Sequence, residues 1–274
     1  MEALKPPMPQ SLAQKTAIIS GSSAGIGAAI AIELSARGAN IVLNYPFPSL
    51  KAECMAVGQQ LKTEWIAVCA DLSTLDGPPK LVAAAVEKFD TINILVNNAG
   101  RVPGGATWEA TAEQWDETFN LNARGMFLLT KAVLPHLPSY KPSSPPLISG
   151  VAEVSRIICI GSGTSRLPQP DAIVYSATKG AIDTMIKVWA KELPPVYGCT
   201  VNGVAPGPVD TKTFRVGCGD QFQEVLNNFA KDTPVEGGLA DVDDIAWTVA
   251  FLAESKSKWI NGEYIMVNGG LCMI

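Results

Sequence analysis

Short apolar runs alternate with helical patterns along almost the whole of this 274-residue chain. Most of the apolar runs lack strict polar–apolar alternation, as expected for strands whose two faces are both covered by helices. The predicted strands cover residues 16–20, 40–43, 65–70, 92–96, 156–160, 200–204 and 264–267. The predicted helices cover residues 25–37, 49–61, 78–89, 112–134, 173–192 and 242–253. Alternation of this kind predicts one α/β domain with a parallel sheet and right-handed crossovers.

Three segments fall outside this alternation. Residues 1–14 begin with a proline-rich stretch that has no apolar core, so we expect a flexible tail and no secretory signal, with the domain spanning residues 15–274. Residues 138–154 hold four prolines among serines and predict a surface loop at the amino-terminal edge of the sheet. Residues 208–239 follow the sixth strand at its carboxyl end and include a short helical pattern at 221–229. That position makes them a candidate substrate lid.

Charge and composition argue against several classes of function. The net charge is −5 and Lys and Arg do not cluster, which argues against a nucleic-acid surface. No apolar run is long enough to span a bilayer. His136 is the only histidine and lies at a proline-bounded helix end, which argues against a Ser-His-Asp triad. The six cysteines lack metal-ligand spacing, so we expect no metal site, and free thiols in a cytoplasmic protein.

Tyr175 and Lys179 stand four residues apart in the predicted helix 173–192, so their side chains share one face. Ser162 lies thirteen residues before the tyrosine, at the end of the preceding strand. A phenol has an ordinary pKa of about 10, which makes it a poor proton relay at neutral pH, and a neighbouring cation lowers that pKa. We therefore expect Lys179 to lower the pKa of Tyr175 and to fit it for acid–base catalysis.

A glycine-rich turn, GSSAGIG over residues 21–27, joins the first strand to the first helix. Glycines permit a tight turn and let the backbone approach a pyrophosphate, whose charge is stabilised by the helix N-terminus. A position between a strand and a helix is what dinucleotide binding requires. The spacing is GxxxGxG and differs from the GxGxxG of the larger dehydrogenases.

Seven motifs occur in a recognisable order along the chain. They are the glycine turn, Asp71-Leu72, NNAG at 97–100, NARG at 122–125, the Ser162, Tyr175 and Lys179 group, Pro206-Gly207, and NGG at 268–270. Over residues 15–270 the chain resembles the single-domain members of the short-chain dehydrogenase/reductase family. Within that family it is similar to 3-oxoacyl-carrier-protein reductases and to fungal polyketide ketone reductases. The resemblance implies a Rossmann-like, doubly wound parallel sheet of seven strands with helices on both faces.

The resemblance also implies a role for each matched position. The implied catalytic residues are Asn122, Ser162, Tyr175 and Lys179. Tyr175 exchanges a proton with the substrate oxygen, to which Ser162 donates a hydrogen bond. Lys179 binds the nicotinamide ribose, and Asn122 holds a water that links Lys179 to solvent.

The implied cofactor site runs from the glycine turn to the end of the sixth strand. Asp71 and Leu72 are expected at the adenine, residues 98–100 at the adenosine ribose, and residues 206–211 at the nicotinamide end. The expected cofactor-binding residues are Gly21, Ser23, Gly25, Ile26, Gly27, Asn44, Ser49, Asp71, Leu72, Asn98, Ala99, Gly100, Tyr175, Lys179, Pro206, Gly207, Val209 and Thr211.

The end of the second strand bears on the choice of dinucleotide. An acidic residue there would bind the ribose 2′-hydroxyl of NAD and repel a 2′-phosphate. Residues 43–49 contain no carboxylate, which favours NADP, and Asn44 and Ser49 could donate hydrogen bonds to a phosphate. No arginine stands there, and Ala24 occupies a position that is often basic in NADP-preferring relatives. The expected cofactor is NADP(H), with NAD as the alternative.

The expected reaction is NADP(H)-dependent reduction of a ketone of a small metabolite, or oxidation of its secondary alcohol, in secondary metabolism by analogy. The alternatives are an NAD-dependent alcohol dehydrogenase and a non-redox cyclase or isomerase on the same fold. The substrate pocket is expected to be partly apolar, with residues 101–105, residues 164–169 and Phe214 around it. Because relatives associate through helices matching 112–134 and 173–192, we expect a homotetramer.

Overall fold

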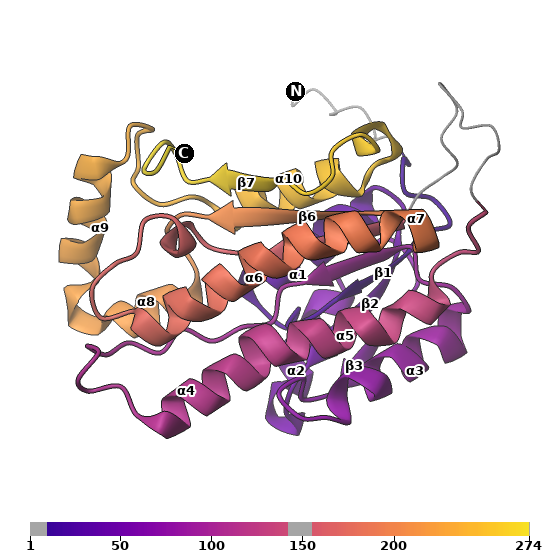
Figure 1. Ribbon diagram of the computed structural model, residues 1–274, viewed down its shortest axis with the longest axis horizontal. Coiled ribbons are helices and arrows are strands. Elements are labelled where there is room, and N and C mark those ends of the chain that lie inside the picture. The colour runs from indigo at the N-terminus through magenta and orange to yellow at the C-terminus, as the bar shows by residue number, and fades with distance from the viewer. Residues whose placement is uncertain (1–9, 142–154, 274) are drawn as a thin grey trace.

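The computed structural model describes residues 10–141 and 155–273. A single sheet of seven parallel strands lies at its centre, in the order β3-β2-β1-β4-β5-β6-β7 (Figure 1). The strands are β1 (Thr16–Ile19), β2 (Asn40–Tyr45), β3 (Trp65–Cys69), β4 (Ile94–Asn97), β5 (Ser155–Ile160), β6 (Cys199–Pro206) and β7 (Tyr264–Val267). The order reverses between β1 and β4, and in open α/β sheets ligands bind beyond the carboxyl ends of the strands at such a point. The predicted doubly wound architecture is confirmed.

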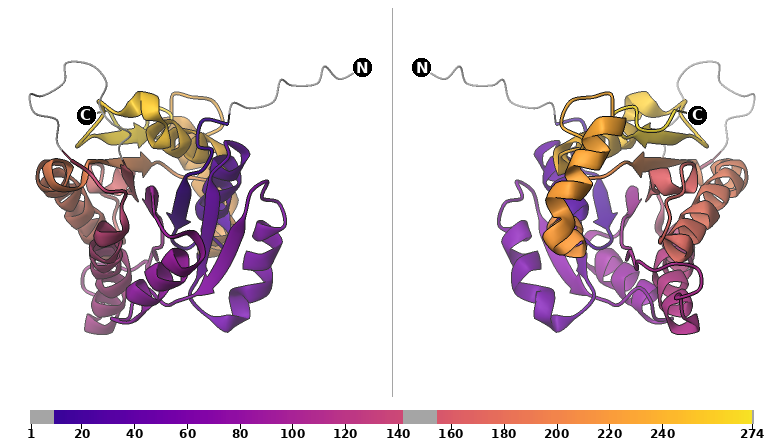
Figure 2. Two further views of the ribbon diagram at one scale, coloured as in Figure 1. Left: turned by 90° about the vertical axis from the view of Figure 1, so that its right-hand side faces the viewer. Right: turned by 90° about the vertical axis from the view of Figure 1, so that its left-hand side faces the viewer.

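Helices cover both faces of the sheet (Figure 2). The helices are α1 (Gly25–Ala36), α2 (Lys51–Gly58), α3 (Gly77–Phe89), α4 (Ala112–Phe119), α5 (Met126–Val133), α6 (Ile173–Glu192), α7 (Pro194–Tyr197), α8 (Lys212–Cys218), α9 (Phe222–Asp232) and α10 (Val242–Ala253). One apolar core joins the sheet to α1, α2 and α10, and a second joins its other face to α3, α5 and α6. Two cores on opposite faces explain why the strands read as continuous apolar runs.

The predicted helix 112–134 is divided in the structure. A π-helix, Asn120–Gly125, separates α4 from α5. A Cβ atom at Gly125 would lie 2.5 Å from the backbone oxygen of Leu72, so the helix can approach the loop after β3 only because this residue is glycine. Wide turns of this kind often occur at functional sites. This one contains Asn122, one of the expected catalytic residues.

The segment after β6 contains two helices where the sequence predicted one. The structure confirms the pattern at 221–229 as α9 and adds α8, whose first turn is capped by Thr211. Both helices lie at the end of the molecule toward which β6 and β7 point (Figure 1). A substrate lid would have to lie at these carboxyl ends of the strands, as both helices do. Closure of the two helices over a substrate stays a prediction.

The chain ends are only partly described. Residues 1–9 of the expected tail lie outside the described residues, but Leu12 is 2% exposed and its backbone N–H donates to the Arg37 carbonyl. Leu12 belongs to the core, so at this residue the prediction of a flexible tail is corrected, while its neighbours from residue 10 to residue 14 are exposed. Most of the predicted loop 138–154, from residue 142 on, lies outside the described residues.

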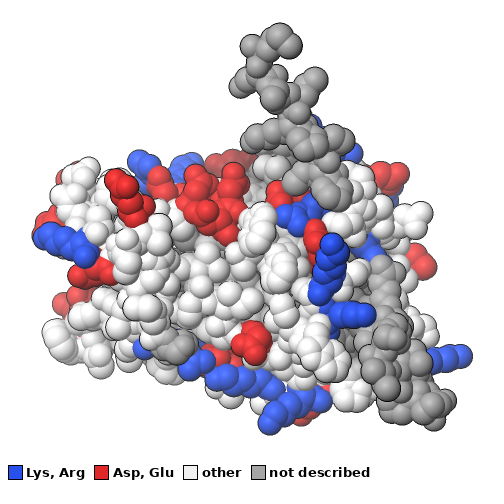
Figure 3. Space-filling model, turned by 90° about the horizontal axis from the view of Figure 1, so that it is seen from above, with Lys and Arg blue, Asp and Glu red and all other residues white. Residues whose placement is uncertain are grey.

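Charged side chains lie mainly toward the edges of the face seen in Figure 3. Several Asp and Glu residues gather near one edge, Lys and Arg are spread along the others, and the middle of the face is mostly uncharged. Within the described ranges, no helix has both the length and the apolar character needed to cross a membrane.

Candidate active site

Ser162 lies two residues beyond the end of β5, at the carboxyl edge of the sheet. It caps a short 3-10 helix, Gly163–Ser165, and its Oγ accepts a hydrogen bond from the Thr164 backbone N–H at 3.2 Å. The Thr164 hydroxyl lies 3.0 Å from the same oxygen. These contacts hold a buried hydroxyl in one orientation at the edge where ligands bind.

Helix α6 brings Tyr175 and Lys179 to the same edge. The ammonium of Lys179 lies 5.6 Å from the centroid of the Tyr175 ring and donates to the Ile160 carbonyl at 2.8 Å. The Tyr175 hydroxyl is near enough to the Ser162 side chain for that side chain to lower the pKa of the phenol. The predicted four-residue spacing therefore does place both side chains on one face, next to the end of β5.

The electrostatics of Tyr175 differ from the expectation. Burial raises the pKa of Tyr175 to about 12, and the nearby Ser162 side chain only partly offsets that effect. Burial lowers the pKa of Lys179 to about 8. The prediction that Lys179 lowers the pKa of Tyr175 is therefore wrong for the protein without cofactor or substrate. Removal of both groups from water has a larger effect on their pKa values than the attraction between them. Tyr175 is thus a protonated acid at neutral pH.

The depressed pKa of Lys179 predicts a dependence of stability on pH. Between its folded value of about 8 and its ordinary value of 10.5, the unfolded chain binds more protons, so the free energy of unfolding rises with pH. From about pH 7.5 to 9, wild type is expected to gain about 1 kcal/mol relative to Lys179→Met. Urea unfolding of both proteins at the two pH values measures this difference, and equal changes would contradict the assignment.

Asn122 is fully buried in the π-helix. Its Oδ1 accepts from the Arg101 backbone N–H at 2.9 Å, and its Nδ2 donates to the Arg101 carbonyl and to the Thr178 hydroxyl. The side chain therefore joins the loop after β4 to α6 and does not face solvent. Its role in holding a water stays a prediction.

The glycine turn has the backbone shape that a pyrophosphate cradle needs. Gly21 and Gly25 have φ of +63° and +56°, a region that favours glycine. A Cβ atom on Gly27 would lie 2.4 Å from the Gly21 carbonyl oxygen, so α1 starts as close to the turn as a helix can. Ala24, at the N-cap of α1, offers no side-chain hydrogen bond to the first turn. The backbone N–H groups of the first turn of α1 therefore have no side-chain acceptor at the N-cap and can donate to a phosphate. The glycine turn thus fits the implied dinucleotide cofactor.

Two polar side chains, those of Ser20 and Asn98, hold the glycine turn through hydrogen bonds to its backbone and to the loop after β4. Ser20 Oγ accepts from the backbone N–H groups of Asn98 and Ala99 at 2.8 and 3.0 Å. Asn98 Nδ2 in turn donates to the carbonyls of Ser20 and Gly21. Ser20 was not among the predicted site residues, and its only signal in the sequence is a polar residue at the end of a buried apolar strand.

Asn44 has a structural role in place of the predicted one. It is 1% exposed, its Oδ1 accepts from the Gly21 backbone N–H at 3.0 Å, and its Nδ2 donates to the Ala70 carbonyl at 2.9 Å. Because these contacts occupy the buried amide, Asn44 is not available to a 2′-phosphate, and that prediction is corrected. Ser49, by contrast, is exposed in the short 3-10 helix Pro48–Leu50 after β2.

The remaining expected cofactor residues lie along the same edge. Asp71 follows β3, and its Oδ1 accepts from the backbone N–H and the hydroxyl of Ser73. Leu72 is buried beside it. On the nicotinamide side, a Cβ on Gly25 would lie 3.6 Å from the Thr211 methyl, so the loop after β6 borders the glycine turn. The other predicted positions on this edge are Ser23, Ile26, Gly100, Pro206, Gly207 and Val209.

The part of the expected substrate pocket around Phe214 is apolar. This ring packs against Phe222 and Phe229 of α9, with centroids 6.3 Å away in each case. Val102 and Leu167 are exposed. Arg101 forms an ion pair with Glu117, so its charge is already matched on the surface.

Comparison with known proteins gives a consistent result. The model of a family described as "Enoyl-(Acyl carrier protein) reductase" matches residues 21–272. The chain is 38% identical over 269 residues to the short-chain dehydrogenase/reductase FrzI of Cladobotryum sp, covering 97% of this chain and 99% of FrzI. It is 35% identical over 269 residues to versicolorin reductase 1 of Dothistroma septosporum, covering 93% and 95%.

Solved structures agree with the sequence comparisons. A blue fluorescent protein from a metagenomic library, in complex with NADPH, superposes with a TM-score of 0.83 at 30% identity, covering 96% of this chain and 100% of that protein. Sequence, topology and site geometry thus lead to one identification: the chain belongs to the short-chain dehydrogenase/reductase family of oxidoreductases.

Proposed function

We propose that the protein reduces a ketone group of a small metabolite with NADPH, or oxidises the corresponding secondary alcohol with NADP. The observation that carries the proposal is the convergence of Ser162, Tyr175 and Lys179 at the carboxyl edge of the sheet, beside a glycine turn shaped for a dinucleotide. Versicolorin reductase 1 is named as a reductase and supports the direction of reduction.

Each catalytic side chain has a distinct task. A bound nicotinamide would supply the hydride chemistry. Ser162 donates a hydrogen bond to the substrate oxygen, and Tyr175, protonated at neutral pH, transfers its proton to the same oxygen as negative charge develops there. Lys179, held against the Ile160 carbonyl, stabilises the tyrosinate that remains. The proton is then restored from solvent.

The preference for NADP rests on the residues after β2. No carboxylate is present between Leu43 and Ser49, so a 2′-phosphate meets no repulsion, and Ser49 is exposed and able to donate to it. Because Asn44 is buried and its amide is already bonded, it cannot donate a hydrogen bond to the 2′-phosphate of NADP. This loss weakens the case for NADP and keeps NAD as the second candidate. An NAD-dependent alcohol dehydrogenase would use the same catalytic residues.

NADPH is expected to bind about tenfold more tightly than NADH, equivalent to about 1.4 kcal/mol. Pro46→Asp, which places a carboxylate directly after β2, is expected to reverse the preference because the charge repels a 2′-phosphate. Fluorescence titration of both proteins with both cofactors measures the affinities. Equal binding of NADH and NADPH by wild type would favour the second candidate.

We also propose that the protein forms a homotetramer in the cytoplasm. Trp115, Phe127 and Val188 are each exposed by more than two-fifths on α4, α5 and α6, the helices expected to pair between subunits. Light scattering at micromolar concentration should give about four times the chain mass of 28.9 kDa, and Phe127→Glu should lower it. A monomer mass for wild type would reject the tetramer.

The cytoplasmic location is supported by six free thiols.

The proposed function is tested by turnover on a panel of ketones. Purified protein is mixed with NADPH and cyclic, bicyclic aromatic and 3-oxoacyl thioester ketones, and the loss of NADPH absorbance is followed. Ketone-dependent oxidation of NADPH is the expected result. Tight cofactor binding without oxidation by any member of the panel would instead support the non-redox alternative.

A further inference from the structure

Tyr264 lies in a slot that two glycines open between neighbouring strands. It begins β7, which pairs with β6 so that Tyr264 stands opposite Gly203. A Cβ atom on Gly203 would lie 2.6 Å from the ring, and a Cβ on Gly161 would lie 2.1 Å from the hydroxyl. Any larger residue at either glycine would displace the tyrosine. The ring can therefore pass from the edge strand to the segment that carries Ser162.

The Tyr264 hydroxyl binds the backbone of Ser162 on both sides. It accepts from the Ser162 N–H at 2.9 Å and donates to the Ser162 carbonyl at 3.2 Å. The Ser165 hydroxyl lies 3.1 Å from the same oxygen. Burial raises the pKa of Tyr264, so the hydroxyl stays protonated at neutral pH. The Tyr264 hydroxyl thus contacts both peptide groups from which the Ser162 side chain projects, and the carbonyl also accepts from the Ser165 hydroxyl at 2.9 Å.

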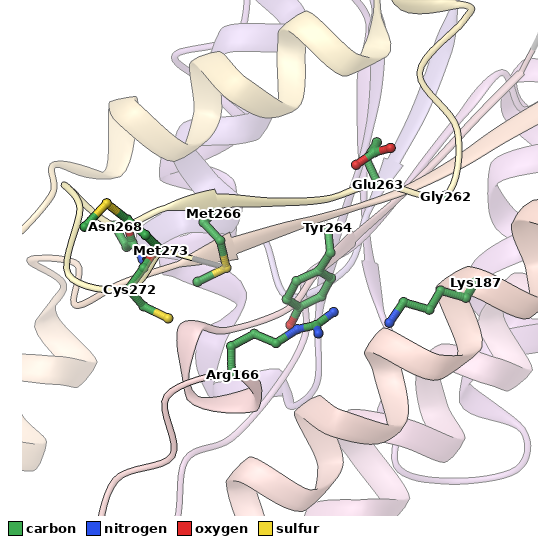
Figure 4. Close-up of a pocket in the computed structure, with 9 residues that line it drawn as sticks. All are labelled: Arg166, Lys187, Gly262, Glu263, Tyr264, Met266, Asn268, Cys272 and Met273. Atoms are coloured by element: carbon green, nitrogen blue, oxygen red, sulfur yellow. The ribbon is translucent and has the colours of Figure 1, made fainter.

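Tyr264 is itself tied to the helix that carries Tyr175. The guanidinium of Arg166 lies 5.6 Å from the centre of the Tyr264 ring and forms a 2.7 Å ion pair with Asp183. Asp183 belongs to α6 and lies one turn beyond Lys179. Figure 4 shows Tyr264 pointing from β7 toward Arg166, with Lys187 of α6 beside them at a surface cleft of about 550 Å³. Arg166, four residues after Ser162, therefore connects the Ser162 segment to α6, and the Tyr264 ring packs against this connection.

We propose that Tyr264 is a positioning residue, which aims the Ser162 hydroxyl at the substrate oxygen through the Ser162 backbone. The inference rests on the proposed function, because it assumes that Ser162 donates to that oxygen. Without the Tyr264 hydroxyl, the Ser162 N–H and carbonyl lose a buried partner and the segment can shift. Displacements of about 1 Å in a catalytic group can cost as much as 100-fold in rate.

Tyr264→Phe tests this role, because it keeps the ring in the slot and removes only the hydroxyl. We expect kcat with NADPH and the best ketone of the panel to fall about tenfold, while the Kd for NADPH changes by less than about twofold. Tyr197→Phe is the matched control. Tyr197 lies on α7, at the amino-terminal end of β6 and far from Ser162, and its replacement should leave kcat unchanged.

A double-mutant cycle separates positioning from a general structural effect. If Tyr264 acts through Ser162, then Tyr264→Phe should cost less than about twofold in kcat when Ser162 is already alanine. A full tenfold loss in that background, or no loss in wild type, would overturn the inference. Should Tyr264→Phe lower the urea midpoint, Arg166→Gln replaces it. This variant keeps the hydroxyl and should give a smaller loss that is again absent with Ser162→Ala.

The cycle also distinguishes this inference from the function on which it rests. If Ser162→Ala alone leaves kcat unchanged, Ser162 is not a catalytic donor, and both the proposed mechanism and the positioning role fail. If Ser162→Ala lowers kcat but Tyr264→Phe does not, only the positioning role fails. The expected pattern is a loss in each single variant and little further loss in the double variant.

Discussion

Tyr175→Phe is expected to lower kcat by about 1,000-fold, within the range that general acid catalysis contributes. We assign the acid to Tyr175 because, among the three proposed catalytic side chains, Lys179 donates to the Ile160 carbonyl and Ser162 can offer only a hydrogen bond. The phenyl ring keeps the packing of α6. Steady-state kinetics with NADPH and a ketone from the panel measures the loss.

The cofactor titration provides the control for this variant. The Kd for NADPH should change by no more than a few-fold in Tyr175→Phe, since the glycine turn and the loop after β6 are untouched. Ser162→Ala should retain more activity than Tyr175→Phe, because it removes a hydrogen bond and not the proton source. Turnover by Tyr175→Phe at the wild-type rate would show that the acid has been assigned wrongly.

Gly27→Ala is expected to weaken NADPH binding by about 100-fold or more, equivalent to about 3 kcal/mol. The added Cβ would lie 2.4 Å from the Gly21 carbonyl oxygen and 2.5 Å from Asn98 Nδ2, both within the cradle. Neither neighbour can move freely, because Gly21 is held by Asn44 and Asn98 by Ser20. The turn must therefore open and its N–H groups lose their common direction. Fluorescence titration measures the affinity.

Gly180→Ala is the matched control for that substitution. Gly180 lies within α6, and a Cβ there would meet no other atom within 4 Å. Alanine in a helix is favoured over glycine by about 0.5–1 kcal/mol, so this variant should bind NADPH normally and unfold at slightly higher urea. If Gly27→Ala binds as tightly as Gly180→Ala, the glycine turn is not the phosphate cradle.

The fold could be predicted because its signals are local and repeated. Buried parallel strands read as apolar runs that alternate with helices of recognisable period, so all six expected helices and all seven expected strands have counterparts in the structure. The convergence of Tyr175 and Lys179 followed from the helical repeat alone. Ser162 joined them because parallel strands end at the same edge.

The features that sequence reasoning missed depend on contacts between distant residues. Asn44 and Ser49 look alike as donors after β2, and only their burial separates a structural amide from an exposed hydroxyl. The direction of the Tyr175 pKa depends on how completely the phenol is removed from water. The approach of Tyr264 to Ser162 joins residues about a hundred positions apart through Gly203 on β6 and Gly161 just after β5, which no local pattern shows.

The transfer of a labelled hydride tests directly whether the protein reduces a ketone with NADPH. NADPH that carries deuterium in place of both hydrogens on the reacting carbon of its nicotinamide is incubated with the protein and the best ketone of the panel, and the product is analysed by mass spectrometry. We expect a secondary alcohol that carries one deuterium on the former carbonyl carbon, and no such product with Tyr175→Phe on the same timescale. A product without deuterium, or conversion of a metabolite that leaves NADPH intact, would contradict it.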